Sequence, residues 1–129
     1  MYNPKFDIDL KFGEVYEDGL KKLLSSKGKI EVKTERDMWI ETGNIAIEVR
    51  CRGRSSGLSV TESDWWFHIL SESGKVKAML CFPVTVLKTT CKYLLKENKA
   101  KLVMGGDDNQ SQILLIPIKE LIGSVGEIF

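Results

Sequence analysis

Two short segments of this sequence each place an acid and a base two residues apart. Residues 31–33 read Glu-Val-Lys, and residues 48–50 read Glu-Val-Arg. Both tripeptides lie in runs, 29–35 and 44–50, that alternate apolar and polar residues with the period of a half-buried strand. If the two strands pair as an antiparallel hairpin with their apolar sides together, the charged side chains share one face. These side chains are Glu31, Lys33, Glu48 and Arg50.

Two carboxylates on neighbouring strands repel each other by some tenths to about one kcal/mol unless a cation lies between them. Mg²⁺ takes oxygen ligands from one or two carboxylates together with water and phosphate oxygens. Lys33 could orient or deprotonate an attacking water, or stabilise charge on a phosphate. The pattern therefore favours metal-dependent phosphodiester chemistry, with a solvated, salt-bridged strand face as the alternative interpretation.

A third acid is expected on a helix that precedes the first strand. Within residues 13–26 an apolar stripe recurs at helical spacing, with lysines on the other side. Glu17 lies at the edge of the stripe, whereas Glu14 points further toward solvent. Glu17 is the preferred helix carboxylate, with Glu14 as its substitute. The stripe consists of Tyr16, Leu20, Leu23 and Leu24.

Together these features resemble the PD-(D/E)XK nuclease superfamily, whose restriction-endonuclease-like fold also contains Holliday-junction resolvases. The matching residues are Glu17, the tripeptide Glu31-Val32-Lys33 and Glu48. The segments 31–39, 42–48, 56–58 and 61–65 look like small phage-type members, and the resemblance covers roughly residues 13–71.

The resemblance implies a DNA endonuclease, with selectivity for junctions as one possibility. It implies hydrolysis of phosphodiesters with Mg²⁺ or Mn²⁺, with Glu17, Glu31 and Glu48 as metal ligands and Lys33 assisting the water. It also implies a homodimer, which acts in the host cytoplasm if the chain is phage-encoded.

Members of the superfamily place an aspartate on the strand before the acid-x-Lys strand, and this sequence has none there. Two assignments stay open. Either Glu48, or with less support Asp64, supplies the missing ligand, or Glu31 takes the role of the aspartate and residues 48–50 stand for acid-x-Lys. The second assignment puts Arg50 where lysine is expected, and arginine cannot act as a base near neutral pH.

Other polar residues near these strands have simpler interpretations. Arg50, Arg52 and Arg54 form a basic Gly/Ser-containing loop suited to phosphate contacts, or to loop solubility alone. His68 is the single histidine and lies between apolar strand residues, so a structural role is favoured over catalysis. Trp65 and Trp66 are expected in the core rather than on a stacking surface.

The remaining pattern predicts the elements that must position these groups. Strands are expected over 65–70 and 76–82, a helix from Pro83 to near Asn98, and strands over 102–104 and 113–118. The order α-β-β-β-β-α-β-β indicates an α/β or α+β fold with a mixed central sheet flanked by helices. The apolar C-terminal run is expected either to close the core or to form a dimer interface.

Length and composition give bounds on class. With 129 residues and 43% apolar content, residues 1–129 are expected to form a single domain, and a net charge of +1 gives no global electrostatic argument for a partner. Three cysteines without CxxC spacing argue against a disulfide framework and a structural zinc site. Since no apolar run is long enough to span a membrane, no membrane partner and a cytoplasmic location are expected.

The hypothesis that competes with a DNA endonuclease is a non-catalytic domain that binds nucleic acid or protein.

Overall fold

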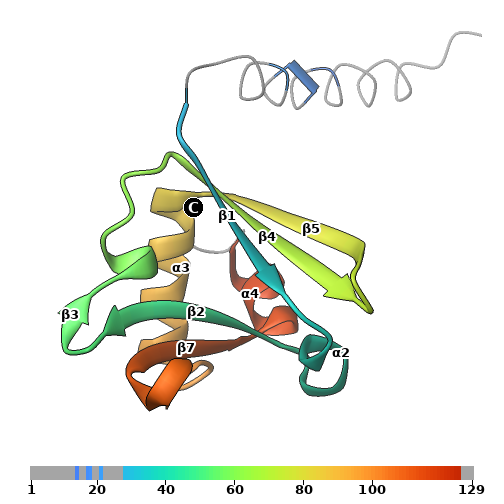
Figure 1. The fold of residues 1–129 in the computed structure, drawn as a ribbon. Coiled ribbons are helices and arrows are strands. Elements are labelled where there is room, and N and C mark those ends of the chain that lie inside the picture. The colour runs from blue at the N-terminus through green and yellow to red at the C-terminus, as the bar shows by residue number, and fades with distance from the viewer. Residues whose placement is uncertain (1–13, 15–16, 19–20, 22–27, 126–129) are drawn as a thin grey trace, which may run out of the picture.

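The computed structural model describes Glu14, Glu17, Asp18, Lys21 and residues 28–125 (Figure 1). Most of the helix expected over residues 13–26 therefore lies outside the described residues. The four residues described there are helical and exposed. Among the described residues, no helix combines the length and apolar character needed to cross a membrane.

The first sheet has three strands in the order β1-β4-β5 and is called sheet A below. Strand β1 (Ile30–Glu35) runs parallel to β4 (Trp65–Glu72), with Val32 opposite Phe67. Strand β5 (Lys75–Pro83) forms an antiparallel hairpin with β4. The alternation at 65–70 and 76–82 predicted both hairpin strands, and each extends slightly beyond its expected bounds.

The second sheet, sheet B, has the order β3-β2-β7-β6 and is antiparallel throughout. Its strands are β2 (Asn44–Cys51), β3 (Arg54–Ser55), β6 (Lys101–Gly105) and β7 (Ser111–Pro117). Strand β2 pairs with β7 along most of its length, with an irregularity between Glu48 and Arg50. Short 3₁₀ turns, η1 (Gly57–Ser59) and η2 (Asp107–Asn109), follow β3 and β6.

The predicted hairpin between residues 29–35 and 44–50 is wrong. Both strands exist, but β1 pairs with β4 and β2 pairs with β3 and β7. The connection between them forms a short helix, α2 (Met38–Thr42), that ends at Gly43 in the left-handed conformation. This helical turn carries the chain out of sheet A and into sheet B, so the strands lie in two sheets rather than one central sheet. The mixed α+β class is confirmed.

Two longer helices complete the fold. Helix α3 (Val84–Lys96) begins one residue later than expected, because Pro83 is its N-cap. Helix α4 (Ile118–Val125) was not predicted, because its apolar residues directly continue the apolar run of β7. Figure 1 shows α3 running from the level of sheet A to that of sheet B.

The hydrophobic core joins both sheets and the two longer helices. It includes Ile45 and Ile47 from β2, Trp66 from β4, and Leu87 and Leu94 from α3, all at most 1% exposed. From the C-terminal run it includes Leu114, Ile116 and Leu121, so these residues close the core, one of the two roles expected for them. The core therefore fixes the position of sheet A relative to sheet B.

Candidate functional site

A polar hollow of about 510 Å³ opens between the two sheets and is called the inter-sheet hollow below. Three of the predicted site residues line it: Glu31 and Lys33 from β1 and Glu48 from β2. They line the same hollow although their strands do not pair, because the sheets pack with these strand faces turned toward a common space. The full lining consists of Lys29, Glu31, Lys33, Glu48, Gly57, Val60, Thr61, Glu62 and Ser63.

Glu31 and Lys33 form an ion pair on the same face of β1. Lys33 Nζ lies 3.2 Å from Glu31 Oε1, with 48% and 34% of the two side chains exposed. A pair this exposed is worth about 1 kcal/mol or less. Either group can therefore exchange its partner for a phosphate or a cation at little cost.

Glu48 is held more firmly than Glu31. The hydroxyl of the buried Ser111 on β7 donates a 2.7 Å hydrogen bond to Glu48 Oε1. Behind it, Gly57 has a φ of +52°, and a Cβ there would collide with the Glu48 carbonyl oxygen. Only glycine allows this close approach without strain. The Ser111 bond engages one of the two carboxylate oxygens and orients the side chain.

The loop before β4 supplies the rest of the lining, through Thr61, Glu62 and Ser63. Backbone bonds bring it beside the start of β1, since the Asp64 N–H donates to the Lys29 carbonyl at 2.8 Å. Sequence reasoning missed these residues because it did not anticipate the parallel pairing of β1 with β4. The signal available in the sequence was the presence of two hydroxyl-bearing residues, Thr61 and Ser63, just before the strand expected over 65–70.

The other candidate ligands lie elsewhere. Glu17 is helical and forms an exposed ion pair with Lys21 at 3.7 Å, and the lining of the hollow includes neither Glu17 nor Glu14. Asp64 also lies outside the lining, and its carboxylate accepts a 3.1 Å hydrogen bond from the Lys29 N–H. Of the predicted metal ligands, the structure therefore brings Glu31 and Glu48 to one space.

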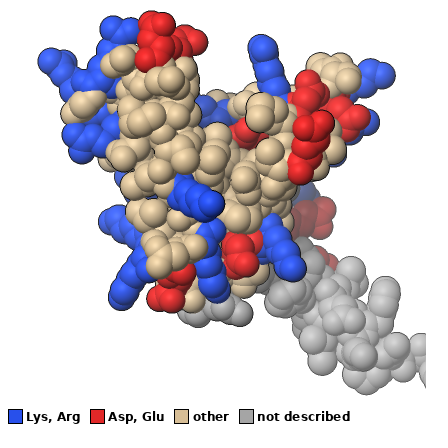
Figure 2. Space-filling model, turned by 90° about the horizontal axis from the view of Figure 1, so that it is seen from below, with Lys and Arg blue, Asp and Glu red and all other residues tan. Residues whose placement is uncertain are grey.

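The three arginines lie on the β2–β3 hairpin rather than in the hollow. Arg50, Arg52 and Arg54 are all exposed, and the Arg50 guanidinium donates a 2.7 Å hydrogen bond to the Gly53 carbonyl. The lining contains Lys33 and not Arg50, so Glu31-Val32-Lys33 places both of its charged residues in the hollow, whereas Glu48-Val49-Arg50 places Glu48 alone there. Figure 2 shows acidic and basic side chains around the edges of the face seen from below, with uncharged residues over much of its middle.

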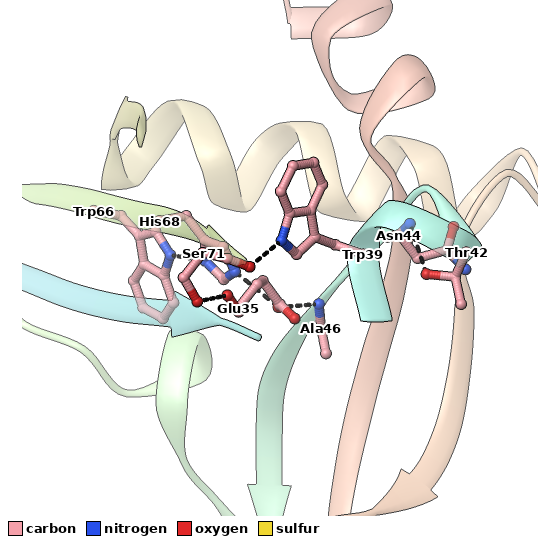
Figure 3. A network of polar contacts seen from close by, with 8 residues as sticks. All are labelled: Glu35, Trp39, Thr42, Asn44, Ala46, Trp66, His68 and Ser71. Atoms are coloured by element: carbon pink, nitrogen blue, oxygen red, sulfur yellow. Dashed lines mark hydrogen bonds and ion pairs between the residues drawn. The ribbon is translucent and has the colours of Figure 1, made fainter. Parts of the chain in front are cut away.

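A network centred on Glu35 ties the two sheets together beside the hollow (Figure 3). Glu35 Oε1 accepts hydrogen bonds from the Ala46 N–H on β2 at 2.5 Å and from His68 Nε2 on β4 at 2.9 Å. One carboxylate oxygen of β1 thus contacts both sheets. Glu35 lies two residues beyond Lys33 and therefore on the same face of β1, but the alternation of residues does not predict this bridge.

The bonds of His68 define its tautomer. The Trp66 indole N–H can only donate, and it lies 3.1 Å from His68 Nδ1, so Nδ1 accepts and carries no proton. Nε2 then carries the proton and donates it to Glu35. The imidazole is 1% exposed and has both nitrogens engaged, so it holds strands in place and is not available as a general base.

The donor set of the hollow suits one hard divalent cation. Within the described part of the chain, no cluster of three or more histidine, cysteine or acidic side chains is arranged to hold a metal. Mg²⁺ needs only one or two carboxylates when water and substrate phosphate complete its shell. Glu31 and Glu48 both line the hollow and could supply these carboxylates, and Thr61 and Ser63 belong to the same lining.

Comparisons with known proteins give no relative from which a role could be transferred. No protein-family model, curated protein or solved structure matches this chain. A functional interpretation therefore depends on the residues of the site.

Proposed function

We propose that the chain is a divalent-metal-dependent DNA endonuclease whose active residues are Glu31, Lys33 and Glu48. The observation that supports the proposal is the presence of these three side chains, from two different sheets, in one open polar hollow. Two carboxylates can hold a hard cation, and a lysine beside them can stabilise charge on a phosphate, so the set suits metal-assisted phosphodiester hydrolysis. The superfamily resemblance stated above supplies DNA as the substrate.

In this proposal each side chain has a separate task. Glu31 and Glu48 would hold Mg²⁺ or Mn²⁺, which when bound would offset the charge of the scissile phosphate. Lys33 leaves its pair with Glu31 and places its ammonium beside the phosphate, where it stabilises the negative charge that develops in the transition state. Ser111 orients Glu48, and the Glu35 network keeps β1 at a fixed distance from β2.

The direct test is cleavage of plasmid, single-stranded and branched DNA in the presence of Mg²⁺, Mn²⁺ or EDTA. We expect metal-dependent cutting that Glu31→Ala and Lys33→Ala each reduce by about a hundredfold or more. Direct conversion of supercoiled plasmid to linear product would indicate two sites acting together, as in the implied homodimer. Cleavage that is equally fast with the metals and with EDTA, or no cleavage of any substrate, would contradict the proposal.

Matched controls separate the site from general effects of charge. Glu41→Ala removes an exposed acid of α2, and Lys77→Ala removes an exposed lysine of β5, both outside the lining of the hollow. Both variants should cut like the parent.

The exposed arginines of the β2–β3 hairpin favour a second candidate, a non-catalytic nucleic-acid-binding domain. Basic side chains on a surface hairpin bind phosphates in a salt-dependent way. This candidate predicts a salt-dependent mobility shift of DNA that Arg52→Ala and Arg54→Ala weaken and Glu31→Ala does not. A shift without cleavage would favour it over the endonuclease.

A further inference from the structure

The surface of sheet A that faces away from the core, called the outer face below, carries apolar side chains on all three strands. Trp66, His68 and Leu70 of β4 are buried, so the alternate residues of that strand point to the opposite side. The strand register places the alternate residues of β1 and β5 beside them. The apolar residues of the outer face include Ile30, Val32, Trp65, Phe67, Ile69, Met79 and Cys81.

Much of this apolar surface is open in the described part of the chain. Val32 is 52% exposed and Met79 is 59% exposed, and Cys81 is also exposed. Parallel strand pairs such as β1–β4 are normally covered on both faces, and a contiguous apolar patch usually marks a contact surface. One face of sheet A packs on the hydrophobic core. The outer face is therefore expected to be covered by another apolar surface.

The sequence directly before β1 contains apolar residues at helical spacing, which predict an apolar stripe about as long as β1. The stripe of Tyr16, Leu20, Leu23 and Leu24 lies in residues 13–26, and three residues separate that segment from Ile30. A connection of two to six residues is usual between a helix and the next strand. A helix over the fourteen residues 13–26 would span roughly 21 Å, and the six residues of β1 span roughly 20 Å.

We propose that the apolar side of segment 13–26 packs on the outer face of sheet A. The four described residues of the segment are charged, helical and exposed, as the solvent side of such a helix would be. A second copy of the chain could cover the outer face but would leave the stripe of the segment uncovered. Packing the segment on its own sheet buries both apolar surfaces at once.

Cys81 provides the test, because it lies on the outer face and the other two thiols do not. Maleimide labelling of the whole chain, followed by mass spectrometry of each cysteine peptide, gives one rate per thiol. In the parent we expect Cys81 to react at least tenfold more slowly than in 8 M urea. Leu20→Asp/Leu24→Asp should raise its native rate at least tenfold.

Controls distinguish the alternatives. Lys21→Asp/Lys22→Asp adds two carboxylates on the polar side of the segment and should leave the Cys81 rate unchanged. Slow labelling of the buried Cys91 reports that a variant is folded. If the leucine variant does not fold, the labelling rate of Cys81 in the parent still tests the proposal. A rate in the native parent close to the rate in urea overturns it. The proposal would also be overturned if Cys81 lost its protection from labelling on dilution and labelled at the same rate in the parent and in the leucine variant. That result would favour a second copy of the chain as the cover of the outer face.

Discussion

Glu48 and Glu31 contribute to the candidate site in different ways. Glu48 is half-buried and oriented by Ser111, and Gly57 packs against its backbone. Among the described residues, Glu31 forms a partly exposed ion pair with Lys33, its neighbour on the same strand face. In the proposed site, an oriented Glu48 and a partly exposed Glu31–Lys33 pair would let a cation and a phosphate enter without breaking a buried contact.

A buried thiol gives the molecule a measurable pH dependence. Burial raises the pKa of Cys91 to about 12, well above the usual thiol pKa of about 8.5. Above roughly pH 9 the unfolded chain loses this proton while the folded chain keeps it, so the free energy of unfolding falls as pH rises toward the folded pKa. Relative to Cys91→Ala, we expect the parent to lose roughly 1–2 kcal/mol between pH 8 and pH 10.

Urea unfolding of both proteins at each pH measures this loss. The substitution also removes core volume, but that cost does not depend on pH, so only the change in the difference counts. Stability curves that stay parallel from pH 8 to pH 10 would contradict the assignment.

At the scale of elements, the position of β1 relative to β2 depends on Glu35. Its carboxylate accepts hydrogen bonds from Ala46 of sheet B and His68 of sheet A. Glu35→Ala leaves both donors without this acceptor, and we expect it to lower the free energy of unfolding by about 2 kcal/mol. Glu31→Ala, on the same face of the same strand, should change stability by about 0.5 kcal/mol or less.

Chemical denaturation of the two variants beside the parent makes the comparison. Equal losses for Glu35→Ala and Glu31→Ala would show that the Glu35 network does not join the sheets.

The alternation of residues predicted the strands but not their partners. A period of two identifies a strand and its faces, so 29–35, 44–50 and 65–70 were each recognised. The same period does not indicate which strands pair with one another in a sheet. The helix Met38–Thr42 is too short to show a periodic stripe, and it is the element that separates β1 from β2. Glu31, Lys33 and Glu48 were therefore brought together in the prediction by a pairing that does not exist, and in the structure by the packing of two sheets.

At the scale of the whole molecule, the candidate site lies where the two sheets meet. Residues from β1, β2 and the loop before β4 line it, and a core common to both sheets fixes their relative position. This arrangement could not be predicted from the sequence, because it depends on contacts between residues far apart in the chain. The charged residues of the site could be predicted from the sequence. The contribution of the hydroxyl-bearing loop and the bridge made by Glu35 could be recognised only in the folded structure.

Binding of Mn²⁺ tests most directly whether Glu31 and Glu48 form one site across the two sheets. Isothermal titration of the parent should give one ion per chain. Glu31→Ala and Glu48→Ala should each weaken its affinity by a similar factor of about ten or more, and Glu41→Ala should leave it unchanged. If only one of the two carboxylates matters, or if all four proteins bind Mn²⁺ equally, the inter-sheet hollow is not the metal site.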